Sequence, residues 1–179
     1  MSLARLTSER DAIAVLRRKV PGAEAVASEV FHPFWWARLQ VRTRGLIPRR
    51  RTADDGGEPA GTVMNVLVNA HSGRSFIADF EPSGEEIDPA QWQEELDRLG
   101  ELRTGVSAED AQIAARALVR TKVVKTVKLG MRIDISPIGA PIPVLKPNWL
   151  VEGANGKFSA RFLVDGLDGT HYVIRAEKL

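Results

Sequence analysis

The chain has 179 residues, of which 44% are hydrophobic and 27% are charged, a composition typical of a globular protein able to bury its own core. Its 25 Lys and Arg residues against 23 Asp and Glu residues leave a net charge of +2, which is not the basic excess of a dedicated nucleic-acid-binding protein. The absence of cysteine excludes disulfides and thiolate metal sites.

Targeting and membrane segments are not recognisable in this sequence. Residues 1–20 carry charged side chains among short apolar spacers, unlike a secretory signal. No apolar run approaches the roughly 18 residues of a membrane span. We therefore expect a cytoplasmic protein, or an extracytoplasmic one if the native N-terminus has been trimmed.

The first half of the chain predicts one helix followed by three strands. Ser8 begins a capping box with Asp11, and apolar residues at helical spacing follow until Pro21-Gly22. Alternating patterns then predict strands at 35–42, 63–70 and 75–80. Between the last two strands, residues 69–73 read Asn-Ala-His-Ser-Gly, which favours a hairpin turn with Gly73 at positive φ.

The second half repeats this order after a connector. A polar segment at 81–89 leads to a short amphipathic helix at 90–102, and Ser107 with Asp110 forms a second capping box. The predicted elements that follow are a helix around 111–118, a strand at 127–136, a proline-rich loop at 137–147, and strands at 149–151, 157–165 and 170–176. Asn155-Gly156 and 165–169 are predicted turns.

Several short motifs occur in the same order in both halves. Val-x-x-Pro-x-Trp is found at 30–35 and 144–149, residues 66–69 align with 162–165, and residues 76–77 align with 172–173. We interpret this order as a diverged duplication of one helix-plus-hairpins unit.

The tryptophans are interpreted through this repeat. Because Trp35 and Trp149 occupy matching positions, we expect each to pack on the helix of its own half. Trp36 points to the opposite face by strand alternation. If that face is uncovered, Phe34 and Trp36 form an exposed apolar patch, which is the candidate partner site.

The first half resembles the PepSY domain. The resemblance is carried by the helix at 12–20, by Pro21-Gly22-Ala23, and by the strand that ends in Asn-Ala-His-Ser-Gly at 69–73. It covers residues 8–80 and, more loosely, 107–176. It implies a small non-catalytic module, of a family often found outside the cytoplasmic membrane and thought to hold proteases or other proteins in check.

Catalytic and metal-binding patterns are weak in comparison. The three histidines lack metal-ligand spacing, and the glycines at 56, 57 and 61 lack the ending of a phosphate loop. Asp165 and Asp168 are typical of a tight turn, although they could also ligate a hard cation. An enzyme would need Asp79, Asp165 and Asp168 to converge in one pocket.

Two basic clusters leave a second interpretation open. Residues 42–51 include Arg49, Arg50 and Arg51, and residues 122–132 carry three lysines and an arginine. Such clusters are usually solvated faces, but they could contact nucleic acid through phosphates.

The sequence thus predicts an α+β fold of two similar units, each a helix on a small antiparallel sheet in a PepSY- or cystatin-like arrangement. We expect a first unit at 1–86, a connecting helix and linker at 87–105, and a second unit at 106–179; whether the two sheets merge stays open. The expected function is a non-enzymatic binding or regulatory module that engages a protein or peptide through an aromatic patch or exposed strand edge. The alternative is a nucleic-acid-associated protein. We expect no cofactor and no metal, in a monomer or small homo-oligomer.

Overall fold

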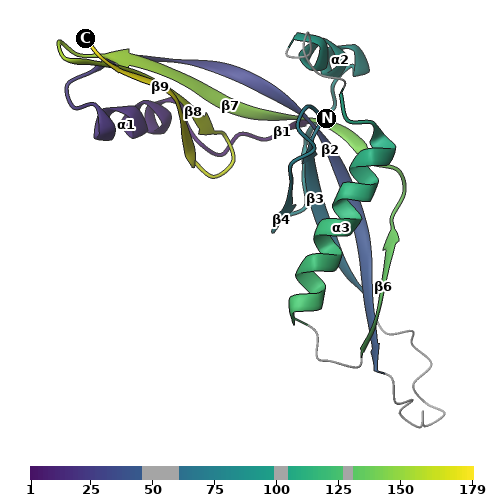
Figure 1. The fold of residues 1–179 in the computed structure, drawn as a ribbon. Helices are drawn as coiled ribbons and strands as arrows, with labels where there is room; N and C mark the ends of the chain where they lie inside the picture. The colour runs from purple at the N-terminus through teal and green to yellow at the C-terminus, as the bar shows by residue number, and fades with distance from the viewer. Residues whose placement is uncertain (46–60, 99–104, 127–130) are drawn as a thin grey trace. The chain divides into compact units, whose positions relative to one another are not determined.

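The computed structural model describes residues 1–45, 61–98, 105–126 and 131–179 and has an α+β fold, as predicted (Figure 1). The helices are α1 (Glu9–Lys19), α2 (Pro89–Arg98) and α3 (Ala108–Thr126). The strands are β1 (Ser2–Leu3), β2 (Glu24–Gly45), β3 (Thr62–Asn69), β4 (Ser75–Ala78), β5 (Gly84–Glu85), β6 (Met131–Pro137), β7 (Ile142–Ala154), β8 (Phe158–Asp165) and β9 (His171–Lys178).

Hydrogen bonds join the nine described strands into one sheet, which answers the question of whether the two predicted sheets merge. Two strands are longer than the sequence predicts. β2 begins at Glu24, directly after the α1 turn, and β7 begins at Ile142, inside the predicted proline-rich loop. Both segments lack a clean alternating pattern, so the sequence offers no period-2 signal there. α2 begins at Pro89, and the end of the predicted connecting helix lies outside the described residues.

The described chain divides into two compact units. Unit 1 consists of Met1–Pro33, Ser83–Glu95 and Val144–Leu179, and unit 2 consists of Phe34–Pro82 and Leu96–Pro143. These units are not the consecutive segments 1–86 and 106–179. Each combines an α-helix and the strand after it from one half of the sequence with the hairpin strands of the other half. β2 and β7 contribute residues to both units, so each unit is described by itself.

The two capping serines begin α1 and α3 as the sequence predicts. Ser8 Oγ accepts a hydrogen bond from the Asp11 backbone N–H at 3.1 Å, and Ser107 Oγ accepts one from Asp110 N–H at the same distance. Each serine hydroxyl also donates to the carboxylate of that aspartate. Both helices therefore begin with one of their otherwise unsatisfied N–H groups bonded.

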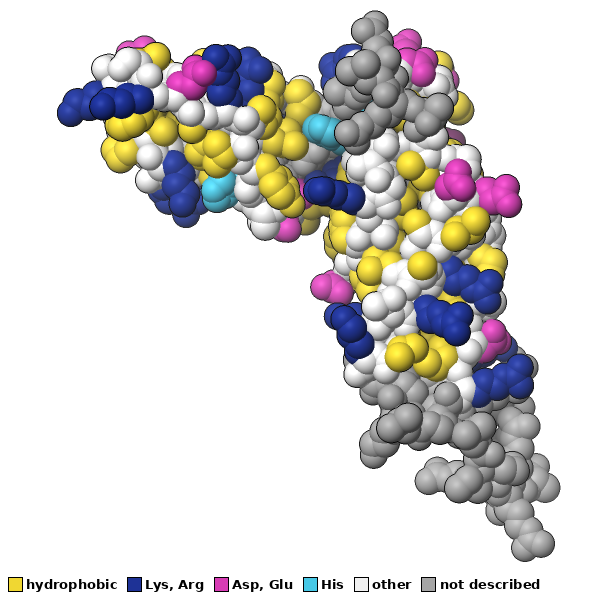
Figure 2. Space-filling model, in the orientation of Figure 1, with side chains coloured by type: hydrophobic (Ala, Val, Ile, Leu, Met, Phe, Trp, Pro, Cys, Tyr) yellow, Lys and Arg dark blue, Asp and Glu magenta, His cyan; other side chains and the backbone are white. Residues whose placement is uncertain are grey.

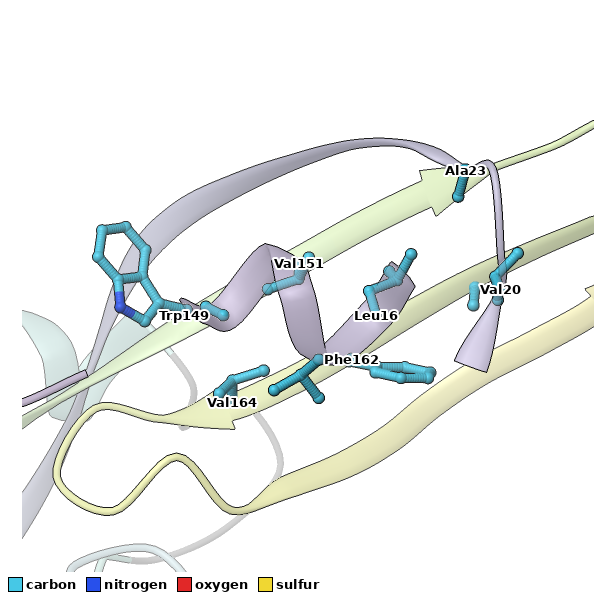
Figure 3. Packing of buried hydrophobic residues seen from close by; sticks show 10 residues of the cluster. Leu16, Val20, Ala23, Trp149, Val151, Phe162 and Val164 are labelled. Carbon is cyan, nitrogen blue, oxygen red and sulfur yellow. The ribbon is translucent and has the colours of Figure 1, made fainter. Parts of the chain in front are cut away.

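The core of unit 1 lies between α1 and the strands β7 and β8 (Figures 1 and 3). Leu16 points from α1 toward Val151 and Phe162, and Val20 and Ala23 extend the cluster beyond the helix end. Leu16 and Val151 are fully buried and Phe162 nearly so. Burying three such side chains stabilises the unit by about 1.5–3 kcal/mol each.

The core of unit 2 lies between α3 and one face of β2 and β3, the face that carries Ala37, Leu39, Val41, Val66 and Val68. α3 supplies Ala111, Ala115, Val119 and Val123, which recur every four residues and so lie on one side of the helix. The small residues at the first two positions belong to one buried cluster with Ala37 of β2 and Val66 of β3. All of these side chains are buried.

The hairpins of the two units pair in the same register. Trp35 lies opposite Val68 and Trp149 lies opposite Val164. The β3–β4 and β8–β9 pairs also match, because Leu67 lies opposite Phe76 and the equivalent Leu163 lies opposite Tyr172. Both hairpin turns use a glycine at positive φ, Gly73 at +68° and Gly169 at +72°, a conformation that costs glycine little.

Candidate binding surface

Phe34 and Trp36 are not an exposed patch. Each side chain is only 7% exposed. The Trp36 indole N–H donates to Asn65 Oδ1 at 3.1 Å, and the Asn65 amide donates in turn to the Phe80 carbonyl oxygen, also at 3.1 Å. Phe34 packs edge-on against Phe76, with ring centroids 6.0 Å apart. The expectation of an exposed aromatic anchor is therefore wrong for this face of unit 2.

Trp35 and Trp149 do pack as matched residues, but on the helix of the other half. The Trp35 indole donates to the carbonyl oxygen of Val106 at 2.7 Å, immediately before the cap of α3. The Trp149 indole donates to the carbonyl oxygen of Thr7 at 2.9 Å, immediately before the cap of α1. The expectation that each packs on the helix of its own half is wrong, because the halves exchange helices.

In the described part of the chain, the two basic clusters meet where β2 pairs with β6, which places Arg44 opposite Arg132 and Arg42 opposite Asp134. Arg49, Arg50, Arg51 and Lys128 lie outside the described residues. Lys122 and Lys125 are exposed on α3, flanking Val123 of the unit 2 core. Arg42 alternates with the core residue Val41 on β2, so its side chain starts on the sheet face away from α3. Figure 2 shows Lys and Arg side chains on unit 2 interspersed with acidic and hydrophobic ones.

The three aspartates considered as possible catalytic residues are divided between the two units, and two of them stabilise a turn. Asp165 Oδ1 accepts from the Leu167 N–H at 2.9 Å, and Asp168 Oδ1 accepts from the Thr170 N–H at 2.8 Å. Asp79 belongs to unit 2 and both of these residues to unit 1. Within the described ranges, no group of three or more His, Asp or Glu side chains is placed to hold a metal ion. Burial lowers the pKa of the Met1 amino group, and nearby Glu86 opposes that shift.

A buried polar network, which the sequence did not reveal, lies at the start of β7 in unit 1. Lys146 Nζ donates to Asp165 Oδ2 at 2.5 Å and to Asn148 Oδ1 at 3.1 Å. The Asn148 amide nitrogen lies 2.8 Å from His32 Nδ1. Since an amide nitrogen only donates, His32 accepts at Nδ1. The lysine side chain is 7% exposed, so the ion pair fixes the hairpin turn at Asp165 to β7.

β9 is exposed along its whole length. Among the described strands it pairs only with β8, and all eight of its residues are exposed. Tyr172, Val173 and Ile174 are 68%, 56% and 54% exposed. Figure 2 shows hydrophobic side chains at the surface of the part that carries α1, β8 and β9. We call the side of His171–Lys178 that faces away from β8 the β9 edge.

The sheet face opposite α1 presents two rows beside this edge. Leu150, Leu163 and Tyr172 lie opposite one another across β7, β8 and β9. In the next row, Glu152, Arg161 and Arg175 are aligned in the same way. Glu152 pairs with Arg161, and Arg175 bonds Glu177 at 2.7 Å. The surface beside the β9 edge is therefore apolar at one end and charge-neutralised at the other.

Comparisons with known protein families, with curated proteins and with solved structures found no match. In the described part of the chain, no helix is both long and apolar enough to cross a membrane. The geometry above is accordingly the basis for a functional proposal.

Proposed function

We propose that the protein is a non-enzymatic binding or regulatory module that adds an extended protein or peptide segment to the β9 edge. The observation that carries this proposal is the exposure of all eight β9 residues, with Tyr172, Val173 and Ile174 more than half exposed. The aromatic pair Phe34 and Trp36 is buried and has no part in it.

The β9 edge has the chemistry that strand addition requires. An edge strand carries a row of backbone N–H and C=O groups that a further strand can bond. Natural edges are usually blocked by proline or by charged residues along the strand. In β9 the apolar run at residues 172–174 lies in the first half of the strand, and the charged residues Arg175, Glu177 and Lys178 lie in the second half.

The fold of the module is proposed to be a duplicated PepSY-like unit whose helices have been exchanged. Support comes from the matched registers of Trp35 with Val68 and of Trp149 with Val164. Further support comes from two equivalent backbone bonds, from Thr7 N–H to the Gly166 carbonyl at 2.9 Å and from Val106 N–H to the Ala70 carbonyl at 2.7 Å. Such a unit would use its sheets for binding rather than catalysis, which is what the resemblance implies.

The test is the selection of extended peptides from a displayed random library, with Val173→Lys beside the wild-type chain. A lysine in the apolar run of the edge should reduce capture of the selected peptides at least tenfold, because strand addition would bury its charge. Val26→Lys is the matched control, since Val26 is a 70% exposed valine on β2 of the same unit. Equal capture by the wild type and Val173→Lys would remove the β9 edge as the binding surface.

A further inference from the structure

The backbone of β9 alternates between groups that bond β8 and groups that face outward. The Leu179 N–H donates to the Lys157 carbonyl at 2.8 Å, and the Asp165 N–H donates to the Thr170 carbonyl at 2.7 Å. Since alternate residues of an antiparallel pair share such bonds, residues 172, 175 and 177 also direct their backbone toward β8. The outward groups are therefore those of His171, Val173, Ala176 and Lys178.

A bulge gives these outward residues an unusual spacing. Arg161 lies opposite Arg175 and Phe162 opposite Val173, which leaves Ile174 as the extra residue. The outward positions 171, 173, 176 and 178 are consequently symmetric about the point between residues 174 and 175. A strand of identical sequence, running antiparallel, can meet all four positions with its own four.

We infer that the partner of the β9 edge is a second copy of this chain, paired antiparallel about a two-fold axis between Ile174 and Arg175. The inference rests on the function proposed above and names the partner. In this register, Val173 lies opposite Ala176 of the other copy, and Tyr172 lies opposite Glu177. Registers displaced from this one leave some of the outward N–H and C=O groups unpaired, which costs free energy where they become buried.

The side chains suit this register on both faces of the sheet. Val173 and Ala176 lie opposite the core residues Phe162 and Ala160, so this apolar pair is on the α1 side. Tyr172 lies opposite Leu163 on the other side, where its phenol can donate to the Glu177 carboxylate of the second copy. Arg175 forms an ion pair with Glu177 of its own strand, with Nη2 2.7 Å from Oε1. The two copies of Arg175 near the axis are therefore each neutralised by a carboxylate.

The register can be read directly because the chain contains no cysteine. Tyr172→Cys and Glu177→Cys are made as separate single-cysteine chains and mixed under mild oxidation. Tyr172 and Glu177 form a non-hydrogen-bonded pair, with Cα atoms about 4.5 Å apart, within disulfide reach. We expect a disulfide-linked dimer from the mixture and little from either chain alone, because two copies of residue 172 lie several residues apart.

Sedimentation of the cysteine-free chain up to millimolar concentration supplies the second readout. We expect a monomer–dimer equilibrium that Val173→Pro shifts at least tenfold toward monomer. That substitution removes an outward N–H while leaving the bonds to β8 in place, which an unchanged thermal midpoint would verify. A wild-type chain that stays monomeric, or cysteine chains that cross-link equally alone and mixed, would overturn the second-copy assignment. Peptide capture that is still lost in Val173→Lys would then leave the proposed function standing with a foreign segment as partner.

Discussion

The indole of Trp149 donates to the carbonyl oxygen of Thr7 at 2.9 Å and so ties β7 to the residue that precedes the α1 cap. Trp149→Phe keeps an aromatic ring but leaves this carbonyl without its donor. We expect a loss of about 1 kcal/mol in the free energy of unfolding, because a partly buried carbonyl loses its hydrogen-bond donor. Urea denaturation measures it. Trp35→Phe, which breaks the equivalent bond to Val106, should fall in the same range.

Trp36 is expected to act as a core residue. Trp36→Ala removes a side chain that is 7% exposed and should cost about 3–5 kcal/mol in unfolding free energy. Tyr172→Ala is the matched aromatic truncation at a 68% exposed position and should change stability by no more than about 0.5 kcal/mol. Equal effects of the two substitutions in chemical denaturation would contradict the burial described here.

Lys146 is expected to stabilise the turn between β8 and β9. Lys146→Met removes the cation that Asp165 accepts from and leaves a largely buried carboxylate, which should cost about 3–5 kcal/mol. Arg161→Met breaks the exposed pair with Glu152 and should cost less than about 1 kcal/mol. The comparison of their thermal midpoints tests whether burial, rather than charge pairing itself, decides the effect.

Gly166 is expected to be intolerant of a side chain. A Cβ there would lie 2.3 Å from the Pro147 carbonyl oxygen, whereas a Cβ at Gly156 would meet nothing within 4 Å. Gly166→Ala should therefore lower the thermal midpoint by several degrees, while Gly156→Ala leaves it near the wild-type value. Circular dichroism melts of the two variants are sufficient. A neutral Gly166→Ala would mean that the backbone at Pro147 moves freely.

Local signals in the sequence predicted local structure well. Ser8 and Ser107 correctly predicted the starts of two helices, and Gly73 correctly predicted a turn with positive φ. Both succeeded because capping and turn chemistry act over three or four residues. The sequence repeat also predicted that Trp35 and Trp149 occupy equivalent positions.

Which helix packs on which strands could not be predicted from the sequence in the same way. The sequence of an amphipathic helix shows which side of the helix is apolar but not which strands will cover that side. The exchange of α1 and α3 between the two halves could therefore not be predicted from hydrophobic periodicity. The hydrogen bonds that join Trp36, Asn65 and Phe80 link residues distant in sequence, and so does the bond between Lys146 and Asp165. The exposure of β9 follows from its edge position, which the alternation of residues 170–176 does not encode.

The exchanged helices also set an order of assembly. Unit 2 uses residues 34–82 and 96–143, so all of its elements are translated before β8 and β9. α1 is translated well before β7 and β8, the strands that bury Leu16. Its apolar side stays uncovered by these strands until β7 and β8 have been made, and contacts between segments so distant in sequence form slowly. The exchange of helices thus lengthens the time for which the apolar side of α1 is exposed during synthesis.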